Sequence, residues 1–288
     1  MAKVSEAVLI TGCSTGIGAA TALRLAKAGR TVYATARHKD TLASLANAGC
    51  RTLCLDVTDE ASMQAAVAEV EGREGAVGVL INNAGYSQSG ALETLPMDRV
   101  RAQFETNVFG LLRLSQLVLP AMRAQGRGRI VNISSMGGKL TLPGGGAYHA
   151  TKYAVEALSD ALRFEVKGFG VDVILIEPGL IRTRFADTVV GGMSGLATGD
   201  GPYASFNKAV EVATQEAYVK GPLAKLAGSA DDVARVIARA LDARRPKARY
   251  RVTASAHMMM TQRALMSDSL WDSFLGTVFP KPGPQQGR

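Results

Sequence analysis

The stretch Thr11-Gly12-Cys13-Ser14-Thr15-Gly16-Ile17-Gly18 lies between an apolar run and a segment with helical periodicity. Gly12 permits a tight turn, Gly16 lets the backbone approach a pyrophosphate, and Gly18 allows a helix to pack closely on a strand. The N-terminus of the following helix offers unpaired N–H groups and the positive end of its dipole to phosphates. The stretch therefore predicts a dinucleotide-binding turn. A glycine-rich turn without a ligand is the alternative.

Strands and helices alternate on both sides of this turn. Strands are expected at 7–10, 31–36, 51–55, 77–81, 129–133, 171–176 and 250–253, and helices at 19–28, 39–48, 58–71, 97–123, 147–167 and 229–243. Such alternation implies parallel strands joined by right-handed crossovers. We expect an α/β doubly wound parallel sheet, a Rossmann fold, in a single domain over 1–279. We expect residues 188–225, glycine-rich at 191–221 and without sustained periodicity, to form a loop-like substrate flap, and 280–288 to be a disordered tail.

Composition limits the function classes. The chain has 288 residues, of which 47% are hydrophobic, and a net charge of +8. It has neither an apolar run long enough to span a membrane nor a signal-peptide pattern, so a cytoplasmic location is expected. Three cysteines without paired spacing favour buried thiols over disulfides or a metal site. The basic cluster at 244–251 has no interleaved aromatic residues, so it favours a solvated helix end over nucleic-acid binding.

The end of the second strand bears on the choice of cofactor. An acidic residue about 20 residues past the glycines usually holds the 2′-hydroxyl of NAD. Here Arg37 follows Thr35 and Ala36, with no carboxylate. A cation suits a 2′-phosphate, and Ser14 and Thr15 can donate to the same group, so NADP(H) is favoured over NAD(H). A surface arginine that accepts either cofactor is the alternative.

Tyr148 and Lys152 are four residues apart in a predicted helix, so their side chains share a face. A nearby ammonium is expected to lower the pKa of the phenol, as general acid–base catalysis requires. The pattern alone is weak because any helix can carry it by chance. His149 points about 100° away around the helix and is expected to be a bystander.

Polar residues follow two expected neighbouring strands. Ser134 and Ser135 follow one, and Asn82-Asn83-Ala84-Gly85 ends the other. The carboxyl ends of strands border the ligand crevice of a doubly wound fold, so a serine there can hydrogen-bond a substrate oxygen. Asn107 lies inside a predicted helix, although asparagine is not a strong helix former. A hydrogen-bonding core asparagine is the alternative for Asn107. Asp56, after the third strand, could accept from an adenine amine or simply form a turn.

These residues together resemble the short-chain dehydrogenase/reductase family, in its single-domain branch. The matching motifs span about residues 5 to 185 and are Thr11-Gly12-x-x-x-Gly16-x-Gly18, Asn82-Asn83-Ala84-Gly85, Ser135, Tyr148-x-x-x-Lys152 and Pro178-Gly179. The resemblance implies a Rossmann fold with a catalytic tetrad of Asn107, Ser135, Tyr148 and Lys152. Ser135 and Tyr148 would polarise a carbonyl oxygen, and Tyr148 would supply or accept the proton. Lys152 would hold the nicotinamide ribose, and Asn107 would hold a water.

The implied activity is NADP(H)-dependent interconversion of a ketone or aldehyde and an alcohol. The expected cofactor-binding residues are Gly12, Ser14, Thr15, Gly16, Ile17, Gly18, Arg37, Asp56, Val57, Asn83, Ala84, Gly85, Tyr148, Lys152, Pro178, Gly179 and Thr183. Ile17 would give a backbone N–H to the pyrophosphate. A protein that binds NADP without turnover is the alternative, although such proteins usually lack the tyrosine or the lysine.

The C-terminal part departs from many members of this branch. Residues 254–279 replace the usual glycine-rich ending and include Met258-Met259-Met260 and Trp271. This ending resembles the hydroxysteroid, retinol and acyl-dihydroxyacetone-phosphate reductases, so a lipophilic small-molecule substrate is expected. The methionines could line an apolar pocket or belong to the core. The helices at 97–123 and 147–167 are expected to pair in a homodimer, as they do in this family.

Overall fold

Seven parallel strands form one sheet in this computed structural model, which describes residues 4–183 and 201–283. The order across the sheet is β3-β2-β1-β4-β5-β6-β9, and every neighbouring pair is parallel. The bounds are β1 Val8–Ile10, β2 Val32–Ala36, β3 Arg51–Cys54, β4 Val79–Asn82, β5 Gly128–Ile133, β6 Val171–Pro178 and β9 Arg249–Val252. Strands up to β3 are added on one side of β1, and strands from β4 onward are added on its other side. This reversal confirms the prediction of a doubly wound α/β fold.

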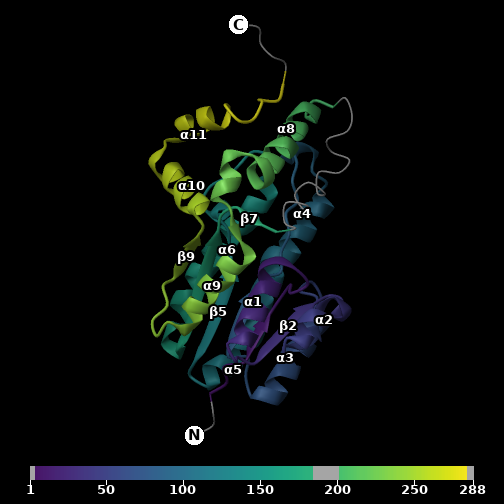
Figure 1. Cartoon of the computed structure of the whole chain (residues 1–288), viewed down its shortest axis with the longest axis vertical. Coiled ribbons are helices and arrows are strands. Elements are labelled where there is room, and N and C mark those ends of the chain that lie inside the picture. The colour runs from purple at the N-terminus through teal and green to yellow at the C-terminus, as the bar shows by residue number, and fades with distance from the viewer. Residues whose placement is uncertain (1–3, 184–200, 284–288) are drawn as a thin grey trace.

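Helices cover both faces of the sheet (Figure 1). Their bounds are α1 Gly16–Lys27, α2 Ala43–Asn47, α3 Glu60–Glu74, α4 Met97–Phe104, α5 Gly110–Ala124, α6 Gly146–Val166, α8 Ala204–Gln215, α9 Ala230–Asp242, α10 Ala254–Leu265 and α11 Asp268–Leu275. Successive side chains of β1 show the two cores. Val8 and Ile10 are buried in the core beneath α1 and α9, whereas Leu9 is buried in the core beneath α3 and α5. This alternation explains why the strands read as continuously apolar.

Two parts of the chain differ from expectation. The segment at 191–221 was expected to be loop-like, but its described part contains α8. Phe206 and Val210, one turn apart, are buried against Ala91, so packing of an apolar stripe stabilises a helix that the glycines obscured. Thr253, expected in the last strand, has φ 89° and caps α10 by accepting from the N–H of Ala256. The flap prediction for 184–200 lies outside the described residues, as does that for the tail at 284–288.

A small two-stranded sheet, β7 Ile181–Arg182 with β8 Gly228–Ser229, connects the end of β6 to the start of α9. At the upper end of Figure 1, α8, α10 and α11 lie beyond the carboxyl ends of the main strands. These three helices come late in the chain. α10 and α11 contribute to an additional cluster of buried residues, among them Met260 and Trp271, whereas α8 packs in a smaller one with Ala91. All three helices therefore stand where side chains can reach the crevice at the strand ends.

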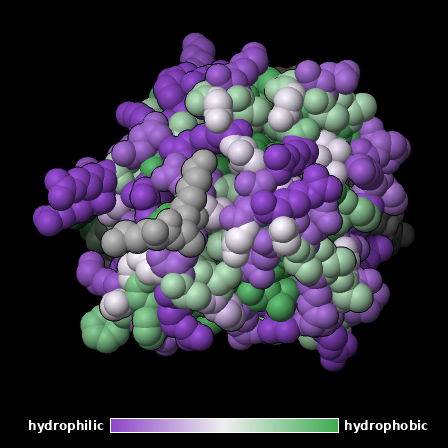
Figure 2. Space-filling model, turned by 90° about the horizontal axis from the view of Figure 1, so that it is seen from below, coloured by the Kyte–Doolittle hydropathy of each residue, from purple (hydrophilic) through white to green (hydrophobic). Residues whose placement is uncertain are grey.

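The opposite end of the molecule is mainly hydrophilic. Figure 2 shows apolar side chains scattered among hydrophilic ones on that face.

The basic cluster at 244–251 is partly neutralised, because Arg249 pairs with Glu156 and Asp160 and Arg251 approaches Glu177. Cys54 was expected to be buried, but it is exposed at the end of β3. Among the described residues, the helices lack the length and apolar character that crossing a membrane requires.

Candidate active site

A cavity of about 1120 Å³ lies at the carboxyl ends of β1, β4, β5 and β6. Each of these parallel strands ends at the same edge of the sheet, so the turns that follow them meet there. The turn after β1 and the N-terminus of α1 form one end of the cavity, and the turn after β5 and the start of α6 form its centre. Side chains of α8, α10, α11 and the residues after α11 close the other end.

The turn after β1 is held by the turn after β4. The Thr11 hydroxyl accepts hydrogen bonds from the backbone N–H groups of Asn83 and Ala84. In return, Asn83 Nδ2 donates to the carbonyls of Thr11 and Gly12 at 2.9 and 3.0 Å. A Cβ on Gly18 would lie 2.4 Å from the Gly12 oxygen, so only glycine permits this approach. The two turns therefore form one rigid wall of the cavity.

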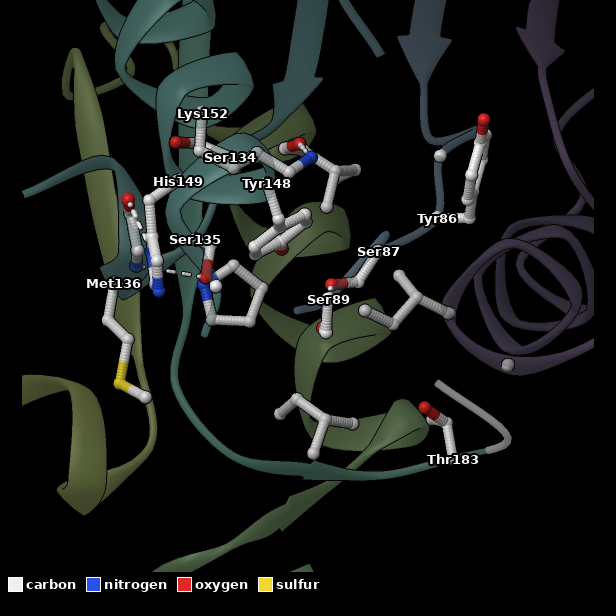
Figure 3. A pocket seen from close by; sticks show the side chains of 18 of the residues that line it. Tyr86, Ser87, Ser89, Ser134, Ser135, Met136, Tyr148, His149, Lys152 and Thr183 are labelled. Atoms are coloured by element: carbon white, nitrogen blue, oxygen red, sulfur yellow. Dashed lines mark hydrogen bonds between the residues drawn. The ribbon is translucent and has the colours of Figure 1, made fainter. Parts of the chain in front are cut away.

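Tyr148 is in the first turn of α6 and lies beside Ser135 in the centre of the cavity (Figure 3). Burial raises the pKa of Tyr148 to about 12, and a hydrogen bond with the Ser135 hydroxyl partly opposes this. The expectation that the lysine lowers this pKa below its ordinary value is wrong for this structure. Desolvation of the phenolate exceeds any opposing electrostatic stabilisation, so the phenol is protonated at neutral pH.

Lys152 lies one helical turn after Tyr148, as the spacing predicts, with Nζ 5.7 Å from the centre of the tyrosine ring. Its ammonium donates to the carbonyl oxygen of Ile133 at 2.8 Å, at the end of β5. Burial lowers the pKa of Lys152 to about 8, and the negative charge of Glu156 opposes that decrease. The ammonium is therefore fixed at the cavity wall, close to where Gly85 passes.

Asn107 lies behind the cavity wall in a π-helical turn, Glu105–Phe109, between α4 and α5. The single helix expected at 97–123 is thus interrupted by a widened turn at the asparagine, a feature common at functional sites. The Asn107 side chain donates to the Tyr86 carbonyl and to the Thr151 hydroxyl and accepts from the Tyr86 N–H. It therefore joins the turn after β4 to α6, directly behind Lys152.

Comparison with known proteins now decides the family. A model described as "short chain dehydrogenase" matches residues 6–193. The chain belongs to the short-chain dehydrogenase/reductase family. A curated relative from Ornithobacterium rhinotracheale, an NADPH-dependent 3-dehydrocapnine reductase, is 33% identical over 92% of this chain and 94% of its own length. A 3-ketodihydrosphingosine reductase from Bacteroides thetaiotaomicron is 43% identical over 63% of this chain and 66% of its own.

The fold of this dehydrogenase/reductase also matches solved structures. A short-chain dehydrogenase from Streptomyces avermitilis superposes with a TM-score of 0.77 and 35% identity over 96% of each chain. That agreement extends beyond the residues covered by the family model, into the part of the chain that holds α8, α10 and α11. The family assignment makes the chain an oxidoreductase.

The structure brings most of the predicted site residues of this dehydrogenase/reductase to one cavity. The residues that line it are Gly12, Ser14, Thr15, Gly16, Ile17, Arg37, Asp56, Val57, Asn83, Ala84, Gly85, Ser135, Tyr148, Lys152, Pro178, Gly179 and Thr183. Two predicted residues do not line it. Gly18 is buried against the Gly12 turn, and Asn107 is buried behind Gly85. Both support the wall from behind.

Sequence reasoning missed several residues of the site. Thr11 was quoted only as part of the motif, yet its hydroxyl joins the two turns. Ser87 and Ser89 line the side of the cavity that faces Tyr148 (Figure 3). His149, expected to be a bystander, is only 7% exposed and lines the cavity. Only Thr11 had a local signal in the sequence, its position directly before the first glycine. The roles of Ser87, Ser89 and His149 depend on contacts between elements that are distant in the sequence.

The far end of the cavity is mainly apolar. Its lining includes Met136, Leu142, Val210, Ala213, Ala217, Tyr218, Met259, Phe274, Leu275, Val278 and Phe279. Of the three consecutive methionines, one lines the cavity, one belongs to the core and the third is exposed. Met259 lines the cavity, Met260 is buried in the adjoining core, and Met258 is 43% exposed. A helix turns about 100° per residue, so adjacent side chains face different surroundings.

Proposed function

We propose that this oxidoreductase uses NADP(H) to interconvert a lipophilic ketone or aldehyde and its alcohol, with Tyr148 as the proton donor in reduction. The observation that carries the proposal is the meeting of Ser135, Tyr148 and Lys152 in the same cavity as the glycine turn.

The turn before α1 fits a dinucleotide pyrophosphate. Gly12 and Gly16 have φ of 70° and 62°, which favour glycine, and a Cβ on Gly12 would lie 2.9 Å from Ala84 Cα. The side chain of Thr15 does not cap α1, and the first turn holds no acidic residue. The first N–H groups of α1 are thus available to an anion, and the helix dipole favours negative charge there.

Arg37 supports NADP(H) rather than NAD(H). It follows β2, is exposed, and lines the cavity together with Ser14 and Thr15. These groups can donate hydrogen bonds to a 2′-phosphate, and no carboxylate stands at 35–37 to bind a 2′-hydroxyl instead. The relative described as an NADPH-dependent 3-dehydrocapnine reductase agrees with this preference.

NADPH, when bound, supplies the hydride for reduction of the carbonyl carbon. Ser135 and Tyr148 would hydrogen-bond the carbonyl oxygen, and the protonated phenol would then transfer its proton to that oxygen. Because its raised pKa keeps the phenol protonated at neutral pH, Tyr148 carries the proton that reduction consumes. Lys152 would hold the nicotinamide ribose through its ammonium. The side-chain N–H groups of Asn107 are engaged, so a relay water would have to donate to one of its oxygens.

The apolar end of the cavity supports a lipophilic substrate. Carbon-rich side chains of α8, α10, α11 and the segment after α11 line the space beyond Tyr148. Burying an apolar chain there is favourable by roughly 25 cal/mol per Å² of apolar surface. The resemblance to a 3-ketodihydrosphingosine reductase and a 3-dehydrocapnine reductase points to the same class. Long-chain ketones are therefore the first substrates to test.

The test is consumption of NADPH with a panel of 3-ketodihydrosphingosine, steroid ketones, retinal, acyl ketones and small polar ketones. We expect turnover of bulky apolar members, and a loss of at least about a hundredfold in kcat in Tyr148→Phe, which lacks the proton. NADPH affinity should change little in that variant. Turnover of small polar compounds alone would refute the substrate class. Tight NADPH binding with no turnover of any member would favour the alternative, a regulatory NADP-binding protein.

A further inference from the structure

The imidazole ring of His149 is enclosed between two glycines of the loop that precedes α6. A Cβ on Gly137 would lie 2.5 Å from Nδ1, and a Cβ on Gly145 would lie 2.7 Å from Nε2. The ring also contacts the Tyr148 ring edge-on, with 5.7 Å between their centres. Glycine at both positions therefore makes room for this ring, which is buried rather than free to turn.

His149 makes a hydrogen bond of defined direction. Nδ1 lies 3.0 Å from the carbonyl oxygen of Gly137. A carbonyl only accepts, so Nδ1 carries the proton. Burial lowers the pKa of His149, although the bond to Gly137 opposes this. The ring is therefore neutral at neutral pH and acts as a fixed donor rather than as a proton shuttle.

The same glycine holds the serine of the active site. The N–H of Gly137 donates to Ser135 Oγ at 3.0 Å. That bond occupies a lone pair of the hydroxyl, which leaves its O–H to donate toward Tyr148 or a substrate oxygen. Figure 3 shows His149 next to Ser135 and Met136, with a dashed line at Ser135. A continuous path thus runs from His149 through Gly137 to Ser135 and Tyr148.

We propose that His149 is a positioning residue that aims Ser135 at the reacting oxygen, an inference that rests on the proposed function. By holding the Gly137 carbonyl, His149 sets the orientation of the turn whose N–H group binds Ser135 Oγ. Loss of the Nδ1 donor lets this turn rotate and misdirects the serine hydroxyl. His149 itself is adjacent to Tyr148 in sequence, yet it acts through the serine.

Two matched variants separate this role from simple packing. His149→Leu keeps an apolar side chain of moderate size but has no donor. His149→Asn places an amide N–H near the position of Nδ1 and can still donate to Gly137. We expect kcat for the ketone to fall about tenfold in His149→Leu and to recover to within about threefold of wild type in His149→Asn. KM for NADPH should stay near the wild-type value in both.

A double-mutant cycle with Ser135→Ala provides the decisive readout. If His149 acts through Ser135, the double variant His149→Leu/Ser135→Ala is no slower than Ser135→Ala alone, because the serine is already gone. If the decreases in kcat of the two single variants multiplied in the double variant, the residues would act independently and the proposal would be overturned. A wild-type kcat in His149→Leu would also overturn it. An increase in KM for NADPH with unchanged kcat would also overturn it.

Amide hydrogen exchange at Gly137, measured by NMR, tests the geometry without turnover. Protection should fall in His149→Leu and remain in His149→Asn. If wild-type protein reduced no ketone, the proposed function would fail, while exchange would still decide whether His149 holds the Gly137 turn. If wild-type protein were active but exchange and kcat were unaffected in His149→Leu, only the positioning role would fail.

Discussion

Replacement of Glu156 by Gln should shift the pH dependence of NADPH use to lower pH through its effect on Lys152. The two residues are four apart on α6, so they lie one turn apart on the same face. The Glu156 side chain is only 5% exposed, so its charge is weakly screened by water. Burial already lowers the pKa of Lys152 to about 8, and Glu156 is the group that opposes this.

The magnitude follows from Coulomb's law. At a separation of ~6–8 Å and an effective dielectric constant of ~20, opposite unit charges attract by about 2–3 kcal/mol. Loss of that attraction would lower a pKa by about 1.5 to 2. Lys139 Nζ at 2.9 Å and Arg249 Nε at 3.0 Å from Glu156 offset part of its field, as they also do for the buried Glu177 nearby. We therefore expect a shift of about one pH unit.

The assay is kcat/KM for NADPH as a function of pH, because this ratio reports ionisations of the free enzyme. An ammonium at Lys152 is needed to hold the ribose, so the ratio should fall as pH rises through the lysine pKa. In Glu156→Gln this fall should begin about one pH unit lower, with the acid plateau unchanged. Glu60→Gln, which removes a surface carboxylate paired with Arg113, is the control and should keep the wild-type profile.

An alkaline limb that stays in place in Glu156→Gln, or that moves to higher pH, would refute the electrostatic reasoning. The same conclusion would follow if Glu60→Gln shifted the profile as much, because overall charge and not position would then be responsible. Thermal melting checks that both variants are folded over the pH range. Lys139, left without its partner in Glu156→Gln, is 35% exposed and can be solvated, so only modest destabilisation is expected.

Four further variants test other parts of the site. Arg37→Ser should reduce kcat/KM for NADPH by about tenfold to a hundredfold, since a charge-assisted hydrogen bond contributes about 1.5–3 kcal/mol. The kcat/KM for NADH should be nearly unaffected. An unchanged ratio of kcat/KM for NADPH to kcat/KM for NADH would contradict this. Gly18→Ala places a Cβ 2.4 Å from the Gly12 oxygen, so NADPH affinity in a fluorescence titration should fall at least about tenfold. Wild-type affinity would show that the backbone at Gly12 can shift to accommodate the methyl group without loss of binding. Ala217→Phe narrows the apolar end of the cavity and should slow bulky ketones more than small ones; equal slowing would place the substrate elsewhere. Phe164 is 87% exposed on α6, so if the long helices pair in a dimer, Phe164→Glu should give a monomer by light scattering. A variant that remains dimeric would show that the interface does not involve Phe164.

Local features of the chain predicted the fold and much of the cavity wall. The glycine turn, the apolar strands and the four-residue spacing of Tyr148 and Lys152 depend on backbone geometry over a few residues. Helices and strands each have a fixed residue period, so such patterns can be recognised in the sequence without knowing which elements contact one another. The helix at 204–215 was missed because glycines on either side obscured a stripe that is stabilised only by packing against Ala91.

What only the tertiary structure decided are the environments of the reacting groups. The pKa of Tyr148 was expected to fall, yet burial raises it, because desolvation depends on atoms brought from distant elements. His149 could be placed on a helix face from its spacing, but its bond to Gly137 depends on how the preceding loop folds back. Sequence spacing thus determined which residues point toward a common edge, while long-range packing determined the dielectric and the partners that set their chemistry.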